Sequence, residues 1–142
     1  MQAVRALHTD PTGDSPPDLL VLLRRAALEC RASARLDTAR ACALFDPESK
    51  ADEIARLLAR ALPQAMHVRP RFHATEASAR SFDERWILAI ADAIARRDID
   101  SERFLLSRRT TPLGGTAISL LMRGFLDRLP REAHRRSELA VS

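Results

Sequence analysis

The chain has no tyrosine and no asparagine, and it has a single lysine and only two cysteines among its 142 residues. Two cysteines are too few for the disulfide scaffold of a small secreted protein. No apolar run approaches the roughly 20 residues of a membrane-spanning helix. The first 18 residues, MQAVRALHTDPTGDSPPD, also lack the apolar stretch of a secretory signal. These absences lead us to expect a cytoplasmic protein that does not enter a membrane.

The motifs of common catalytic and cofactor sites are missing as well. The sequence contains no GxSxG, HExxH, P-loop or dinucleotide-binding fingerprint. Its four histidines are scattered, and a metal site built on His67 and His73 would still need a third ligand. We therefore expect no cofactor and no metal. The absence of these motifs favours a protein without catalytic chemistry, although an active site assembled from residues far apart in the sequence stays open.

The two cysteines, Cys30 and Cys42, are 12 positions apart. On one straight helix they would lie about 18 Å apart, too far for a disulfide. Neither belongs to a CxxC motif, so both are interpreted as free thiols packed like small hydrophobic side chains.

Almost all of the basic side chains are arginines. The net charge is +4, from 23 basic and 19 acidic residues, and Lys50 is the one lysine. Together with 24 alanines, this usage is typical of a GC-rich, bacterial-like genome. Residues 66–81 and 99–129 each carry a net charge of +2, so the modest excess lies in the second half of the chain.

The hydrophobic periodicity is helical throughout, and no run of alternating β-branched residues indicates a sheet. The sequence predicts an all-α fold, a compact bundle of four to six helices with an extended connecting segment near residues 63–74. A single helical domain is expected over 18–129. It would lie between a flexible N-terminal segment, 1–17, and a basic flexible tail, 130–142.

Several helix boundaries can be predicted from local chemistry. Apolar positions from Leu19 to Phe45 follow helical spacing, with a break expected near residues 33–38. The run Asp46-Pro47-Glu48 favours a helix start, and Pro63 a helix end.

Three later boundaries follow from the same reasoning. Ser81 and Glu84 match a capping box, which opens a helix with Phe82, Trp86, Ile90 and Ile94 on its buried stripe. Asp100 or Ser101 is expected to cap a shorter helix carrying Phe104 and Leu105. The last helix is expected over 113–129.

The segment 108–116, RRTTPLGGT, is the most distinctive local feature. Helix N-termini offer unpaired N–H groups to anions, and glycines let a ligand approach the backbone. The simpler interpretation is that Thr111 caps the next helix while the glycines allow tight packing.

Helices near 82–97 and 101–109 also invite comparison with a helix-turn-helix, although acidic residues lie at the end that would meet DNA. The candidate anion or nucleic-acid contacts are Arg103, Arg108, Arg109, Thr111, Gly114, Gly115 and Thr116.

The run Leu19-Leu20-Val21-Leu22-Leu23 is wider than one helical stripe. Part of it must be deeply buried or available to a partner, so Leu19, Leu20 and Leu23 are candidate interface residues. We therefore expect a small non-catalytic helical protein that acts by protein–protein interaction or self-association, with a dimer favoured and a regulatory role conceivable. The alternative is a small nucleic-acid-binding or anion-sensing domain that uses the arginine-rich region 96–116.

Overall fold

Six helices and no strand make up the computed structural model over residues 16–129, the part of the chain that the structure describes. The all-helical prediction is thereby confirmed. The predicted tail 130–142 and most of the predicted segment 1–17 lie outside the described residues. None of the described helices is long and apolar enough to cross a membrane. The helices are α2 (Asp18–Glu29), α3 (Thr38–Leu44), α4 (Ala51–Met66), α5 (Phe82–Ala95), α6 (Ile99–Arg109) and α7 (Pro112–Asp127).

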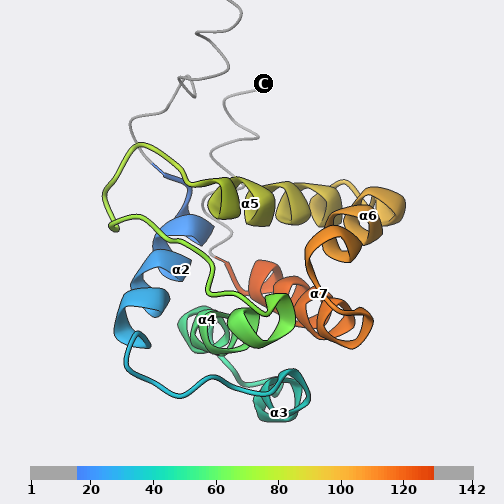
Figure 1. Cartoon of the computed structure of the whole chain (residues 1–142), viewed down its shortest axis with the longest axis horizontal. Coiled ribbons are helices and arrows are strands. Elements are labelled where there is room, and N and C mark those ends of the chain that lie inside the picture. Colours follow the sequence, from blue (N-terminus) through green and yellow to red (C-terminus); the bar gives the residue numbers. More distant parts are fainter. Residues whose placement is uncertain (1–15, 130–142) are drawn as a thin grey trace, which may run out of the picture.

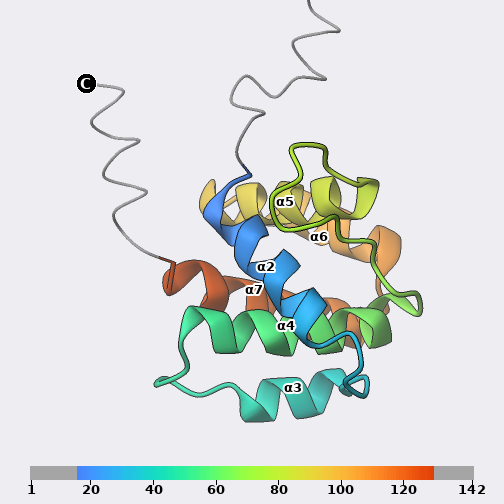
Figure 2. The ribbon, with the colours of Figure 1, turned by 90° about the vertical axis from the view of Figure 1, so that its left-hand side faces the viewer.

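The helices are arranged in three levels (Figures 1 and 2). The α5–α6 hairpin forms one level, α4 and α7 pack against each other in the middle, and α3 lies on the far side of that pair. Helix α2 runs down one side and packs on α4. A long segment without regular structure, residues 67–80, returns from the end of α4 past α2 to the start of α5.

One cluster of buried apolar side chains links all of these helices. Burial of such side chains contributes about 1.5–3 kcal/mol each to folding before chain entropy is counted. Close backbone approach adds to the packing of α4 on α7, because a Cβ on Gly114 would lie only 2.9 Å from the Cβ of Ala65. The N–H of Thr111 also donates to the Ala65 carbonyl at 3.2 Å.

Two predicted helix starts are confirmed in atomic detail. Ser81 and Glu84 form a reciprocal capping box at α5, each side chain accepting the other's backbone N–H at 3.0 Å. Trp86 is 6% exposed, as predicted for a core residue, and its indole N–H donates to the Leu105 carbonyl at 2.8 Å. At α7, Thr111 accepts the N–H of Gly114 at 3.0 Å and Pro112 occupies the first turn.

The predicted bounds of the second long helix were wrong at both ends. Asp46 accepts the N–H of Glu48, but this caps an isolated turn, and α4 begins only at Ala51. Pro63 does not end the helix, which continues through it to Met66. Favourable burial of the α4 face on α2 and α7 overrides the cost of an interior proline. The irregular segment therefore begins at residue 67 rather than 63.

Other details also differ from the prediction. A break between α2 and α3 is present but spans residues 30–37. The cap of α6 is Asp98, which accepts the N–H of Ser101 at 3.0 Å, and not Asp100 or Ser101. Phe82 and Phe104 are 68% and 61% exposed, so neither belongs to the core, and a guanidinium group lies over each ring.

Candidate anion-binding pocket

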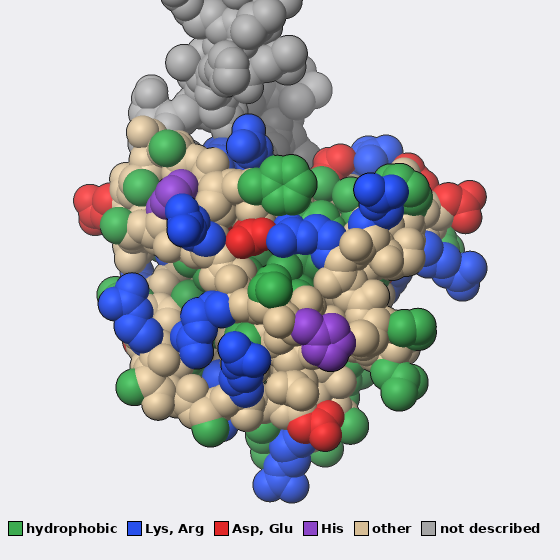
Figure 3. All heavy atoms as spheres, viewed as in Figure 1, with side chains coloured by type: hydrophobic (Ala, Val, Ile, Leu, Met, Phe, Trp, Pro, Cys, Tyr) green, Lys and Arg blue, Asp and Glu red, His purple; other side chains and the backbone are tan. Residues whose placement is uncertain are grey.

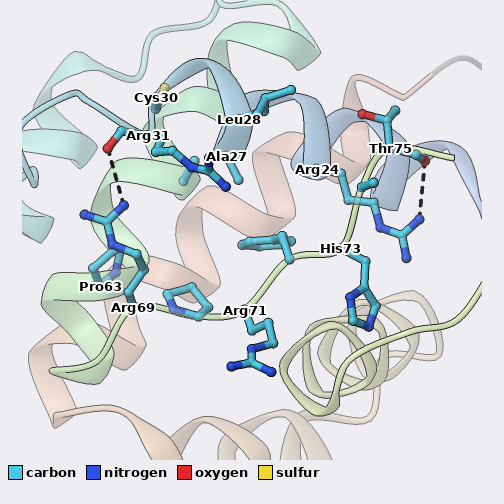
Figure 4. A pocket seen from close by; sticks show the side chains of 14 residues that line it. Arg24, Ala27, Leu28, Cys30, Arg31, Pro63, Arg69, Arg71, His73 and Thr75 are labelled. Atoms are coloured by element: carbon cyan, nitrogen blue, oxygen red, sulfur yellow. Dashed lines mark hydrogen bonds between the residues drawn. The ribbon is translucent and has the colours of Figure 1, made fainter. Parts of the chain in front are cut away.

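An open hollow of about 580 Å³ lies between the C-terminal half of α2, the middle of α4 and residues 69–75 (Figure 4). We call it the arginine pocket. Its volume falls in the range of small-molecule and peptide side-chain sites. The residues that line it are Arg24, Ala27, Leu28, Cys30, Arg31, Ala59, Pro63, Arg69, Pro70, Arg71, Phe72, His73, Ala74 and Thr75.

The arginine pocket combines apolar surface with positive charge. Its lining includes alanine, leucine, phenylalanine and two prolines, but no aspartate or glutamate. Arg31, Arg69 and Arg71 are exposed, and within residues 16–129 none of the three guanidinium groups is part of an ion pair. Figure 3 shows arginine side chains gathered on this face, on the side of the view where Figure 1 places α2. This hollow therefore has positive charge beside an apolar surface, although the charge of Arg71 also interacts electrostatically with Asp83.

Arg24 differs from those three arginines because it is buried and fully partnered. Its Nε and Nη2 donate to the two carboxylate oxygens of Glu84 at 2.8 and 2.9 Å. Nη1 donates to the carbonyls of Ala77 and Thr75 at 2.7 and 3.3 Å, and Nη2 also donates to that of Ala79 at 2.9 Å. All five N–H groups of the guanidinium are used. Arg24 thus holds the wall of the arginine pocket and has no donor left for a ligand.

Glu84 completes this buried network from α5. Besides Arg24, it accepts the backbone N–H of His73 at 2.8 Å and that of Ser81. Burial acts to raise the pKa of Glu84, but the hydrogen bonds from Arg24, His73 and Ser81 outweigh it and leave the pKa below its ordinary value. The carboxylate is therefore ionised and ties residues 73–81 to α2 and α5.

Sequence reasoning identified Glu84 as a cap but missed Arg24 and the arginine pocket. The one available signal was the position of Arg24, a single turn after Leu20 and directly after Leu23. Both leucines are fully buried, so a charged residue on that stripe needs a buried partner. The identity of the partner, 60 positions away, cannot be inferred from spacing.

The candidate anion loop at 108–116 folds as a cap, which is the simpler of the two interpretations of its sequence. Gly114 donates to Thr111 Oγ1, and Gly115 donates to the Thr111 carbonyl at 2.7 Å. Both glycines are buried against Ala65 and Thr110, and exposed Thr116 donates its hydroxyl to the Pro112 carbonyl. The first turn of α7 thus uses these groups internally.

The predicted arginines of this region do not converge on one point. Arg109 pairs with Asp83 at 2.5 Å and lies about 5 Å from the ring centroids of Phe82 and Trp86. Its unpaired Nη1 is buried against those rings. Arg108 lies over Phe104, while Arg103 lines a separate groove between α6 and α7. The groove's buried Glu102 accepts from Ser119 and Arg123.

The three candidate interface leucines have different surroundings. Leu20 and Leu23 are fully buried within this chain, which removes them from any exposed face, and Leu19 is half-buried against the core. The apolar run Leu19–Leu23 is wider than one helical stripe because α2 is covered by α4 and also by residues 67–80.

The cysteines and histidines form no shared cluster in the described part of the chain. Cys30 and Cys42 are both free thiols, and burial raises the pKa of Cys42. His73 lines the arginine pocket, while His67 lines a different, shallower hollow. Among residues 16–129, no group of three or more histidine, cysteine or carboxylate side chains could hold a metal ion.

No family model, no curated protein and no solved structure matches the chain.

Proposed function

We propose that this protein is a non-catalytic helical binding module, and that the arginine pocket holds an acidic segment of a partner protein. The observation that carries the proposal is the set of three exposed guanidinium groups, none of them in an ion pair within residues 16–129, around an apolar hollow that no carboxylate lines. Binding a carboxylate there would give these guanidinium groups an ion-pair partner, which they do not have within the described part of the chain.

The apolar surface favours a peptide over a nucleic acid. Leu28 is 60% exposed beside the pocket, and Phe72 is half-buried within it. Such surface complements apolar side chains flanked by acidic ones, in the way that interface anchors fill pockets. A sugar–phosphate backbone presents charge without that apolar complement.

Binding of terminally blocked hexapeptides that combine acidic and apolar positions tests the proposal. Fluorescence anisotropy should show binding that weakens as salt is raised and that is lost when the acidic residues become glutamine or asparagine. The double variant Arg31→Glu/Arg69→Glu should bind about tenfold more weakly or worse, a change of only about 1.4 kcal/mol.

Arg103→Glu provides the matched control, because Arg103 is an exposed arginine on α6, outside the pocket. It should bind the peptides like the parent. If no acidic peptide binds better than its neutral counterpart, the proposal is wrong. If single-stranded oligonucleotides bind more tightly than every peptide and Arg103→Glu weakens them, the nucleic-acid alternative takes its place.

Self-association is a second candidate function, and exposed apolar side chains at the helix ends favour it. Leu113 is 84% exposed and Phe82 is 68% exposed. A two-fold contact would bury such groups. Sedimentation velocity over a hundredfold range of concentration should show a dimer that Leu113→Glu dissociates; a monomer at every concentration contradicts this candidate.

A further inference from the structure

Residues 69–74, which form one wall of the arginine pocket, have the features of a single extended strand. They contain no helix, turn or bend, and their exposure alternates. Arg69 and Arg71 are exposed, whereas Pro70 is buried and Phe72 packs against the core. Alternation with a period of two is typical of an extended chain. No strand pairs with this segment within residues 16–129, so its edges must be satisfied in another way.

Side chains at the start of α5 satisfy one edge of the segment. The backbone N–H of Arg71 donates to Asp83 Oδ2 at 2.6 Å, and the Arg71 carbonyl accepts the Ser81 hydroxyl at 2.6 Å. Two residues further on, the N–H of His73 donates to Glu84 Oε2 at 2.8 Å. In an extended chain the N–H and C=O groups of successive residues point to opposite edges. Alternate residues of the segment therefore bond to α5.

The opposite edge keeps free hydrogen-bonding groups. Pro70, Phe72 and Ala74 direct their backbone groups away from α5, because they alternate with the residues that bond to it. Within residues 16–129, no hydrogen bond is made by the Pro70 carbonyl, by either backbone group of Phe72 or by the Ala74 N–H. Such a row of unpaired donors and acceptors is what an exposed strand edge presents.

This free edge borders the arginine pocket. Residues 69–75 all line the hollow, without a gap in the series. Successive side chains point to opposite faces of an extended chain, so the hollow that both sets line is also bordered by the backbone edge between them. No residue of α5 lines the pocket, which leaves the edge that faces away from α5. Figure 4 shows the segment from Arg69 to His73 running opposite α2 across the pocket.

We propose that residues 69–74 bind an acidic peptide by strand addition, in which the peptide lies extended along the free edge and pairs its backbone with Phe72 and Ala74. This inference rests on the proposed function and deepens it, because it defines the conformation and the pattern of the ligand. Side chains of paired residues lie on the same face of a sheet. Peptide residues opposite Phe72 then meet the apolar face, and their neighbours lie beside Arg69 and Arg71. The ligand therefore alternates apolar and acidic positions.

The charge of the segment selects such a peptide over a second copy of this chain. Pairing two copies along this edge would bring Arg69 and Arg71 of one copy beside those of the other, and like charges across a strand pair are destabilising. An acidic peptide places carboxylates there instead. In strand addition the backbone hydrogen bonds supply affinity, and the alternate side chains supply specificity.

Amide hydrogen exchange followed by NMR tests the two edges directly. In the protein alone, the amides of Arg71 and His73 should exchange slowly because α5 holds them, while those of Phe72 and Ala74 exchange faster. Saturation with the best-binding acidic hexapeptide should slow exchange at Phe72 and Ala74 about tenfold or more and leave the other two unchanged. Equal exchange of all four amides in the free protein, or no slowing at Phe72 and Ala74, would overturn the inference.

N-methylation of the same hexapeptide at each position in turn tests the pairing from the side of the ligand. Binding should weaken about three- to tenfold at alternate positions only, because every second N–H of an extended peptide faces the protein. Equal weakening at adjacent positions, or none at any position, would contradict strand addition while leaving the effect of Arg31→Glu/Arg69→Glu intact. Loss of that charge effect would overturn the proposed function itself.

A pair of variants at position 74 removes one donor of the edge. Ala74→Pro deletes the free N–H but keeps the carbonyl that accepts the N–H of Ala77, and it should bind the hexapeptide about three- to tenfold more weakly than wild type. Ala74→Val is the matched control, because it has similar bulk at an exposed position and keeps the N–H. It should bind like wild type, and equal affinities of the two variants contradict the role of this donor. Circular dichroism and thermal melting establish that both are folded.

Discussion

The guanidinium of Arg24 on α2 and the carboxylate of Glu84 on α5 form a fully buried ion pair joined by two hydrogen bonds of 2.8 and 2.9 Å. The two residues are 60 positions apart in the chain. The remaining donors of Arg24 hold three carbonyls of the segment that precedes α5. One side chain thus joins two helices and fixes the wall of the arginine pocket.

Removing one member of this pair leaves the other charged, buried and unpaired. We expect Glu84→Gln and Arg24→Met each to lower the free energy of unfolding by about 3–5 kcal/mol. The double variant should lose less than the sum of the two, because neither charge then remains. Urea unfolding followed by circular dichroism measures all three, and simple additivity would show that the two residues are not coupled.

Stability should also depend on pH through Glu84. Its pKa is lowered in the folded protein, so the carboxylate stabilises the fold fully at pH values above its unfolded pKa of about 4.3 and loses that effect as the pH falls through the folded value. The free energy of unfolding should therefore decline below about pH 5. Urea titrations at several pH values should show a shallower decline for Glu84→Gln. An equal decline in Asp52→Asn and wild type is the expected control result, since Asp52 is exposed.

Gly124 marks a point where α7 leaves no room for a side chain. A Cβ at this position would overlap the ring of Phe45, which the guanidinium of Arg128 covers at 4.8 Å from its centroid. Gly124→Ala should destabilise the protein by about 1–3 kcal/mol despite alanine's better helix propensity. Thr116→Ala on an exposed turn of the same helix should change stability by less than about 0.5 kcal/mol. Thermal melting that ranks the two variants in the opposite order contradicts this packing.

Thiol labelling offers a direct view of the arginine pocket. Cys30 is partly exposed and lines the pocket, whereas burial raises the pKa of Cys42 and lowers its thiolate fraction. Iodoacetamide should therefore modify Cys30 before Cys42, as read by peptide mass spectrometry. A saturating acidic hexapeptide should slow labelling of Cys30 and leave Cys42 unaffected. Unchanged labelling of Cys30 would place the peptide elsewhere on the protein.

Local chemistry was a reliable guide where the interacting groups are neighbours in sequence. The capping box of Ser81 and Glu84 and the Thr111 cap each depend on residues within one turn, and the burial of Trp86 follows the apolar periodicity of its own helix. Pro63 shows the limit of such reasoning. A proline favours a helix end locally, but here the apolar face of α4 continues past it and is buried by other helices.

The candidate site was harder to predict, because it is made by tertiary contacts. Arg31 follows α2, whereas Arg69 and Arg71 both lie in the segment 67–80, and only the path of that segment past α2 brings the three together. The sequence emphasised Arg108 and Arg109 instead, since they stand beside glycines and a helix start. Nothing in the sequence indicates that Arg109 is paired with Asp83, whereas the packing of the glycines agrees with the simpler interpretation of this segment.

Because all five N–H donors of Arg24 are hydrogen-bonded, few substitutions at this position can be tolerated in evolution. A lysine at that position offers three donors from a single nitrogen, so it cannot reproduce five hydrogen bonds to partners spread over one helix and a loop. A neutral residue at position 24 would in turn leave the carboxylate of Glu84 without its main partner. Divergent versions of this fold should therefore either keep arginine and glutamate together at these two positions or replace both, and the pair would serve as a two-residue signature for finding distant relatives.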